Sequence, residues 1–301
     1  MANNEITEAG ADHIKDILTF SRLKKLVISG NPLKHAGVQV FGESLYHSRS
    51  SVTHLELEKC HLDCQALRCL FEVLKHNSTL ESINLSGNIG GTRRTLVYKT
   101  LTVMLSQNRR LTQLIMRQCC LGDNFALHLS EGLHNAQKIE YIDLSGNQLT
   151  CEGAASIAVA LCYRVNSSVR YLDMSNNRIG DMGGKKLAQM VRLNRGGLRT
   201  LKLSHNELGA ETGQEMLDGV KDNASLEHLD LSDNLIPLHI LTVIAKHLKH
   251  TQKSKHLQEL PKARAKLIRY QNVRKELRAV KRGIFETEKE ALVEQYHADK
   301  E

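Results

Sequence analysis

The 301-residue sequence contains no tryptophan and only 3 prolines, and aromatic residues make up 4% of it. Its core must therefore be mainly aliphatic, and its connecting segments must mostly be short. It has no apolar run of about 18 residues, the length that a membrane-spanning helix needs. The N-terminal sequence MANNEITEAG has neither the basic segment nor the apolar stretch of a secretory signal. We therefore expect a cytoplasmic protein.

The cysteines carry no framework for disulfide bonds or for a metal. They are seven in number, which is odd, and they follow no regular spacing, as a reducing compartment tolerates. The nearest candidate for a metal site combines Cys60, His61, Cys64 and Cys69. We expect these cysteines to be small buried hydrophobic residues instead, because Cys69 lies in a predicted helix and Cys60 closes a predicted strand. The sequence therefore predicts no metal and no cofactor.

An internal repeat with a spacing of 28 to 31 residues dominates the chain. Eight segments fit the pattern L-x-x-L-x-L-x-x-N/C when other aliphatic residues replace Leu. They begin at Leu23, Val52, Leu80, Leu111, Ile139, Val169, Leu198 and Leu226. A repeat at such spacing is typical of a solenoid, in which each unit packs against its neighbours.

Each repeat predicts a strand, a turn and a helix. The second and third Leu positions, such as Leu55 and Leu57, alternate on a short strand and point into the core, so the residue between them faces outward. The Asn or Cys that follows can bond backbone groups that the turn leaves unpaired. At this position we expect Cys60 and Cys119 to be buried thiols. Apolar residues at helical spacing complete each unit.

These features resemble the ribonuclease-inhibitor type of the leucine-rich-repeat (LRR) family, in which repeats of this length carry a full helix and Asn alternates in part with Cys. The resemblance implies an α/β solenoid, or horseshoe, with parallel concave strands, convex helices and a C-terminal helical extension. It also implies protein binding, although members of the family bind unrelated partners. We expect an N-terminal half-repeat or helical cap at 1–22, eight repeats at 23–248 and a basic amphipathic helical tail at 249–301.

The outward strand positions predict a partner-binding surface. Tyr141 and Tyr171 fall at the same position of neighbouring strands, with Asp143 and Asp173 beside them. Aromatic anchors next to charges are typical of binding hot spots. A solvated ladder that only keeps the sheet soluble is the alternative. The residues predicted to bind a partner on the concave face are Arg117, Tyr141, Asp143, Tyr171, Asp173, Lys202 and Asp230. Over all the concave positions, three basic residues stand against five acidic ones, which predicts a mildly acidic face.

The last 65 residues, from Pro237 onward, carry +7 of the net charge of +8. Their apolar residues recur at steps of three and four, which indicates an amphipathic helix. Such a tail can cap the solenoid, or it can dock on an acidic surface of a partner. The residues predicted to contact that partner are Lys262, Lys266, Arg269, Arg274 and Arg278.

Three classes of function fit the sequence. The first is a non-enzymatic protein-interaction scaffold in a cytoskeletal, ciliary or other large intracellular assembly, and we favour it because no catalytic motif appears at a credible spacing. The second is GTPase activation of the Ran type, which the repeats alone allow. The third is sequence-independent binding of nucleic acid through the basic tail, although Tyr270 is the only aromatic residue between Lys246 and Arg282.

Overall fold

The structure is a computed structural model, and it describes residues 1–46, 50–88, 94–136, 138–162, 168–194 and 197–259. The chain divides into two compact units, Met1–Leu248 and Lys249–Glu301. The five predicted tail residues from Lys262 to Arg278 lie outside the described residues. The description below concerns the first unit.

Eight short strands form one parallel sheet in which every strand pairs with the next one along the chain. The second Leu position of each repeat is in register across the sheet, so that Leu55 pairs with Leu26 on one side and with Ile83 on the other. The strands are β1 (Lys25–Val27), β2 (His54–Glu56), β3 (Ser82–Asn84), β4 (Gln113–Ile115), β5 (Tyr141–Asp143), β6 (Tyr171–Asp173), β7 (Thr200–Lys202) and β8 (His228–Asp230). This arrangement confirms the predicted α/β solenoid.

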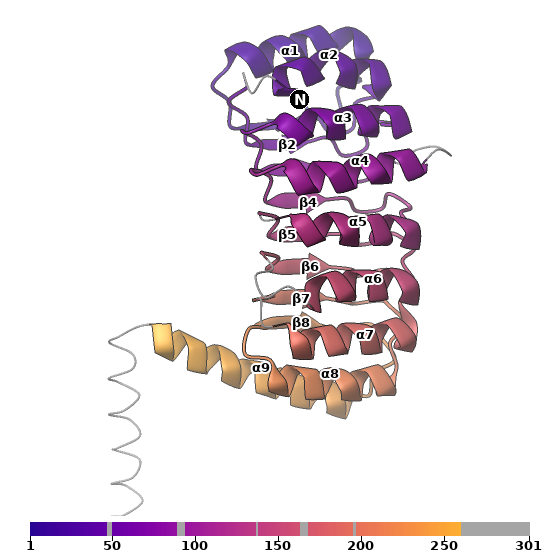
Figure 1. Cartoon of the computed structure of the whole chain (residues 1–301), viewed down its shortest axis with the longest axis vertical. Helices are drawn as coiled ribbons and strands as arrows, with labels where there is room; N and C mark the ends of the chain where they lie inside the picture. The colour runs from indigo at the N-terminus through magenta and orange to yellow at the C-terminus, as the bar shows by residue number, and fades with distance from the viewer. Residues whose placement is uncertain (47–49, 89–93, 137, 163–167, 195–196, 260–301) are drawn as a thin grey trace, which may run out of the picture. The chain divides into compact units, whose positions relative to one another are not determined.

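The helices stack in a second layer along the sheet (Figure 1). Each inner repeat contributes one helix after its strand, which returns the chain to the start of the next strand, as a parallel sheet requires. The helices are α1 (Ala11–Phe20), α2 (Lys34–Tyr46), α3 (Cys64–His76), α4 (Arg94–Gln107), α5 (Asp123–Asn135), α6 (Cys151–Cys162), α7 (Gly180–Leu193), α8 (Ala210–Asp222) and α9 (Leu238–Glu259), and the 3-10 turn η1 (Glu8–Gly10) precedes α1. None of the helices in the described residues is long and apolar enough to span a membrane.

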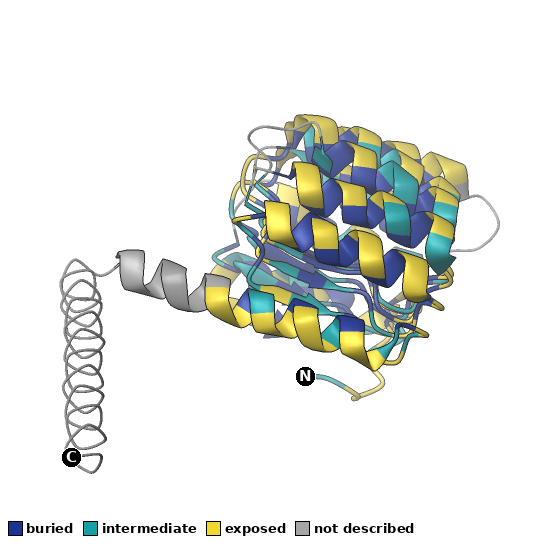
Figure 2. Cartoon of the chain, turned by 90° about the horizontal axis from the view of Figure 1, so that it is seen from below, coloured by how far each residue is buried: buried dark blue, intermediate teal, exposed yellow. Residues whose placement is uncertain are grey.

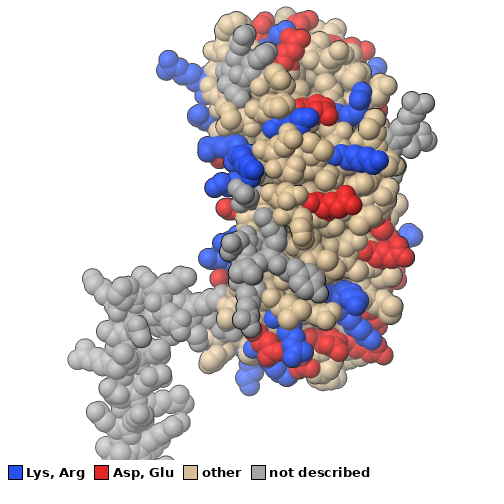
Figure 3. Space-filling view, in the orientation of Figure 1, with Lys and Arg blue, Asp and Glu red and all other residues tan. Residues whose placement is uncertain are grey.

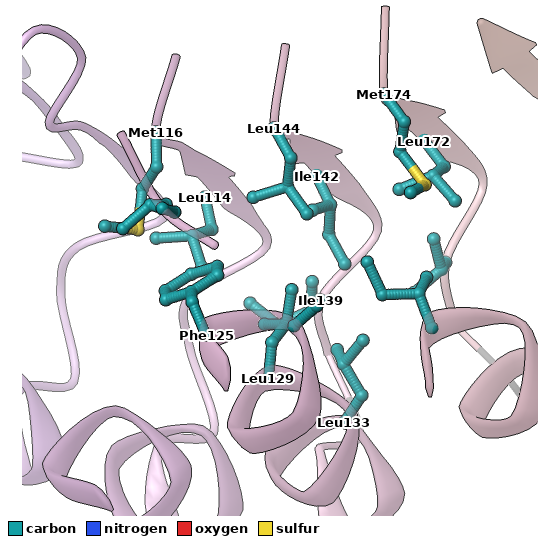
Figure 4. Packing of buried hydrophobic residues seen from close by; sticks show 14 of the residues in the cluster. Leu114, Met116, Phe125, Leu129, Leu133, Ile139, Ile142, Leu144, Leu172 and Met174 are labelled. Atoms are coloured by element: carbon teal, nitrogen blue, oxygen red, sulfur yellow. The ribbon is translucent and has the colours of Figure 1, made fainter. Parts of the chain in front are cut away.

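The core lies between the sheet and the helices and is mainly aliphatic, as the composition predicts. In the repeat of β5, Ile142 and Leu144 are fully buried and face Leu129 and Leu133 of α5 (Figure 4). Figure 2 shows that the helices are buried on the side that faces the sheet and exposed on the other. The core continues to the last repeat, where Ile240, Ile244 and Leu248 of α9 are buried.

A ladder of asparagines, all buried except the last, closes the strands, and we call it the strand ladder. The side-chain Oδ1 of Asn88 accepts hydrogen bonds from the backbone N–H groups of Cys60 and Leu62 in the preceding repeat. Its Nδ2 donates to the carbonyl oxygens of Leu57 and Leu85. These bonds satisfy backbone groups that the turn leaves without partners, which is a requirement in a buried location. The ladder consists of Asn31, Asn88, Asn147, Asn177, Asn206 and Asn234.

Cys60 and Cys119 occupy the strand ladder in the other two repeats, as predicted. Both thiols are buried, and neither forms a disulfide bond. The Sγ of Cys60 donates to the carbonyl oxygen of Ile28 at 3.3 Å, and that of Cys119 donates to the carbonyl oxygen of Leu85 at 3.4 Å. A thiol can therefore replace one of the donor functions of Asn at this position.

A second asparagine ladder, which the sequence analysis did not predict, lies where the helices end. Asn108 follows α4, and its Nδ2 donates to the carbonyl oxygens of Leu74 and Asn77. Its Oδ1 accepts from the backbone N–H of Leu111. Asn77, Asn194 and Asn223 make matching bonds. Asparagine side chains therefore tie neighbouring repeats together after the strands and, in several repeats, also after the helices.

Candidate functional site

The centre of the candidate site is a pair of stacked tyrosines on the concave face of the sheet. Tyr141 and Tyr171 begin β5 and β6 and are paired in register. Their ring centroids are 4.0 Å apart and their planes differ by 8°. Both side chains are half-buried, and burial raises the pKa of both hydroxyls. The predicted placement of both rings on the concave surface is confirmed, and both hydroxyls are protonated at neutral pH.

Asp143 lies beside the tyrosines and is buried under Arg117. Its side chain is 2% exposed, whereas that of Arg117 is 48% exposed. The carboxylate accepts a hydrogen bond from the Nε of Arg117 at 2.6 Å, and it also accepts from the backbone N–H and the hydroxyl of Ser145. Asp143 thus holds the guanidinium in place from below.

Asp173 holds the other end of the tyrosine pair in a similar way. It accepts hydrogen bonds from the Tyr171 hydroxyl at 3.2 Å and from the backbone N–H of Ser175 at 3.0 Å. The Nζ of Lys202 lies 3.9 Å from this carboxylate and 5.6 Å from the centroid of the Tyr171 ring. Lys202 is therefore placed by a cation–π contact and by a weak ion pair.

The structure brings six of the seven predicted concave residues into one cluster, Arg117, Tyr141, Asp143, Tyr171, Asp173 and Lys202. We call this set the tyrosine cluster. Asp230 is the seventh, and it pairs with Lys202 in the register of β7 and β8. Its carboxylate accepts from the backbone N–H and the hydroxyl of Ser232 instead of joining the contacts among the other six.

The number of acidic and basic residues at the concave positions does not tell which charged groups are exposed to solvent there. Asp143 and Asp173 are two of the five acidic residues behind the predicted mildly acidic surface, and both are buried. Arg117 and Lys202, in contrast, each expose more than two fifths of their side chains. Elsewhere, basic and acidic side chains are interspersed on the face drawn in Figure 3. The polar groups exposed at the tyrosine cluster are mainly hydrogen-bond donors.

Ser145 and Ser175 position the cluster, and the sequence analysis did not single them out. A signal was present, because Asp or Asn followed two residues later by Ser occurs at Asp143, Asp173, Asp230 and Asn84. In each case the backbone N–H of the Ser donates to the acidic or amide side chain. This pairing predicts a fixed outward side chain wherever the motif closes a strand.

No metal-binding arrangement competes with this surface in the part of the chain that the structure describes. Within that part, no three His, Cys, Asp or Glu side chains are placed to hold a metal ion. The sequence motif around Cys60 is explained by the strand ladder, because its thiol donates to backbone carbonyl oxygens.

Similar proteins support the repeat assignment. The family described as "Leucine Rich repeat" matches residues 135–158, 165–188 and 222–236. The ribonuclease inhibitor of Sus scrofa is 26% identical over 259 residues, which cover 77% of this chain and 56% of the inhibitor. The human "NACHT, LRR and PYD domains-containing protein 12" is 27% identical over 274 residues, which cover 81% of this chain and 26% of that protein. The chain therefore has the leucine-rich-repeat fold, and its repeats are similar to those of ribonuclease inhibitors.

The chain spans about half of the inhibitor and about a quarter of the human protein. Among solved structures, the tropomodulin C-terminal domain of Caenorhabditis elegans is 13% identical with a TM-score of 0.42, and the match covers 65% of this chain and 98% of that one. This similarity is too low to support a shared function.

Proposed function

We propose that this chain is a non-enzymatic protein-interaction scaffold that binds a partner protein on its concave face through the tyrosine cluster. The stacked pair of Tyr141 and Tyr171 carries the proposal. Two half-exposed rings that are already fixed lose little conformational entropy when a partner covers them. Tyrosine and arginine are also the residues that most often dominate binding energy at protein interfaces.

Proteins of the same repeat type support a binding function in general terms. The relative from Sus scrofa is named for the inhibition of ribonuclease. We do not extend that target to this chain, because its concave face is neither strongly acidic nor rich in aromatic residues. The large assembly in which the scaffold would act, which we propose to be cytoskeletal or ciliary, stays a prediction.

The test replaces both tyrosines by serine and compares the variant with Tyr46→Ser. Tyr46 is also exposed, but it lies at the end of α2 and packs against His76. Partners are captured with the full chain, and the affinity of a purified partner is then measured for each variant. We expect the double variant to weaken binding by about 2 kcal/mol or more, as for a hot spot. The Tyr46 variant should bind like the original.

An unchanged melting temperature of the double variant shows that the loss of binding is not a loss of fold. The proposal is wrong if a purified partner binds the double variant as tightly as the original chain. It is also wrong if Tyr46→Ser weakens that binding as much.

The basic tail supports a second binding site for an acidic partner surface, because residues 237–301 carry nearly all of the net charge. We propose Lys262, Lys266, Arg269, Arg274 and Arg278 as its contacts. Reversing the charges of the first three should remove a tail-dependent partner and leave the melting temperature of the repeats unchanged. Binding that withstands moderate salt would argue against this site, because exposed charges are screened.

The same variants separate the alternative functions. Loss of binding to random single-stranded RNA after charge reversal would favour nucleic-acid association. Acceleration of GTP hydrolysis by a Ran-type GTPase would favour the activating function. Both alternatives stay predictions from the sequence.

A further inference from the structure

All three acidic residues at or beside the tyrosine cluster accept hydrogen bonds from the chain itself. Asp143 accepts from Arg117 and Ser145, and Asp173 accepts from Tyr171 and Ser175. The side chains of these two acids are 2% and 10% exposed. Asp230, at the edge of the surface, accepts two hydrogen bonds from Ser232. A ligand on this surface meets few free acceptors.

The exposed cations, in contrast, keep donors for a ligand. Arg117 contacts Asp143 through Nε and also makes a side-chain hydrogen bond with Tyr141, and a guanidinium has five N–H donors, which leaves some for a ligand. The distance of 3.9 Å between Lys202 and Asp173 is too long for a hydrogen bond. Because the buried carboxylates nearly balance these charges, the cluster has little net field with which to attract a ligand from a distance. It can select a ligand only by local hydrogen bonds.

We propose that the tyrosine cluster selects a partner segment that carries acidic side chains, with a carboxylate bound to the outer donors of Arg117 and a second acceptor at Lys202. This inference rests on the proposed concave binding function and adds the chemistry of the partner. A carboxylate matches the fork of N–H donors at the end of a guanidinium. The tyrosine rings between the two cations then contact the body of the segment.

The spacing of the strands sets the size of that segment. Arg117 follows β4 but contacts Asp143 of β5, and Lys202 ends β7 but contacts Asp173 of β6. One strand spacing, roughly 5 Å, therefore separates the carboxylates that hold the two cations. An extended peptide rises about 3.3 Å per residue, so about two residues cross this distance. The acidic side chains of the segment should be separated accordingly.

A segment with lysine or arginine at these places fits poorly. Its charges would meet Arg117 and Lys202 at the surface, while Asp143 lies beneath the guanidinium and is already bonded. Only Asp230, at one edge and partly exposed, offers a carboxylate. The donors and acceptors of the cluster therefore discriminate against a basic partner.

The test uses a random twelve-residue peptide library displayed on phage, selected in parallel on the full chain and on the Tyr141→Ser/Tyr171→Ser variant. Peptides that bind the original chain and not the variant report on the tyrosine cluster. We expect these peptides to be enriched in Asp and Glu over the starting library. One such peptide is then synthesised, together with a version in which Gln replaces each acidic residue.

The acidic peptide should bind Arg117→Gln and Lys202→Gln more weakly than the original chain, by roughly ten- to hundredfold for the arginine. Lys202→Gln serves as the safer variant for folding, because Lys202 is exposed and makes only a weak ion pair, at 3.9 Å, with Asp173. The Gln version of the peptide should lose a comparable factor on the original chain and little on Arg117→Gln.

The possible outcomes separate the two proposals. Tyrosine-dependent peptides enriched in Lys and Arg, or with no charge preference, would overturn the acidic partner and leave the concave binding function standing. An acidic peptide that binds both lysine and arginine variants as tightly as the original chain would overturn it as well. A library without tyrosine-dependent peptides would count against the binding function and the acidic partner together.

Discussion

Replacing an asparagine of the strand ladder by alanine should cost stability in proportion to the hydrogen bonds that its side chain makes. Asn88 and Asn206 form a matched pair, because they occupy the same position of the repeat and are 1% and 0% exposed. Both donate through Nδ2 to the carbonyl oxygens of two core residues. They differ at the other atom of the amide.

The Oδ1 of Asn88 accepts from the N–H groups of Cys60 and Leu62, at 2.9 and 3.1 Å. The Oδ1 of Asn206 is buried without a hydrogen-bond partner. A buried hydrogen bond contributes about 1 kcal/mol net. Asn88→Ala should therefore lower the free energy of unfolding by about 2 kcal/mol more than Asn206→Ala, since it also leaves two buried N–H groups unpaired. Asn206→Ala also removes a buried oxygen that has no hydrogen-bond partner, which lowers the cost of this substitution and widens the difference between the two variants.

Urea unfolding of both variants measures this difference, provided that the m-value stays constant. Native-state hydrogen exchange adds a local measure, because only Asn88→Ala should speed exchange at the amides of Cys60 and Leu62. Equal losses of stability in the two variants, within about 0.5 kcal/mol, would refute the reasoning, since that is the limit for unrelated surface changes.

Three further predictions follow from the packing and the pKa values. Gly219→Ala should destabilise the fold by about 1–3 kcal/mol, as overpacking does, because a Cβ there would lie 2.7 Å from the carbonyl oxygen of Ala188; thermal unfolding measures this. Burial raises the pKa of Cys119 to about 11, so this thiol should resist a thiol reagent at pH 8 in the folded chain. A hydrogen bond from the Thr212 hydroxyl lowers the pKa of Asp181. Thr212→Val should therefore cost more stability at pH 6 than at pH 2, because the contribution of a carboxylate with a lowered pKa is present above its ordinary value of 3.8 and is lost as the pH falls through its folded value.

Each of these predictions has a control in the same chain. Gly122 has no atom within 4 Å of an added Cβ, so Gly122→Ala should change stability little. Cys151 is partly exposed and should react faster than Cys119. A chemical-shift titration of Asp181 should show its pKa rising towards the ordinary value in the Thr212 variant.

The fold could be predicted because a single local pattern repeats eight times. Two buried Leu positions separated by one outward residue define a strand such as Leu55 to Leu57, and the Asn or Cys after it marks the end of the strand. The ladder at the ends of the helices escaped prediction, because Asn77, Asn108, Asn194 and Asn223 have counterparts in only some repeats. Ala136, for example, follows α5 at the position where Asn108 follows α4.

The faces of the outward residues were also predictable, because strand alternation alone places Tyr141 and Tyr171 side by side. The extent to which the outward residues are buried, and the charge that they expose to solvent, could not be predicted from the sequence. Asp143 is an outward residue in the pattern, yet its carboxylate is buried, because the side chain of Arg117 reaches across from the neighbouring strand and covers it.

Arg117 itself shows why the charge of this face depends on more than one repeat. Six of the other seven repeats have Ser where Arg117 stands, after the last core residue of the strand, among them Ser86, Ser145 and Ser175. Such a serine has too short a side chain to reach the next strand, and it bonds within its own repeat or to a backbone N–H of the next one. An arginine at this position instead removes a neighbouring carboxylate from solvent and replaces it with a guanidinium. One substitution between strands thus turns an acidic position into a surface that offers donors, and only the pairing of β4 with β5 reveals it.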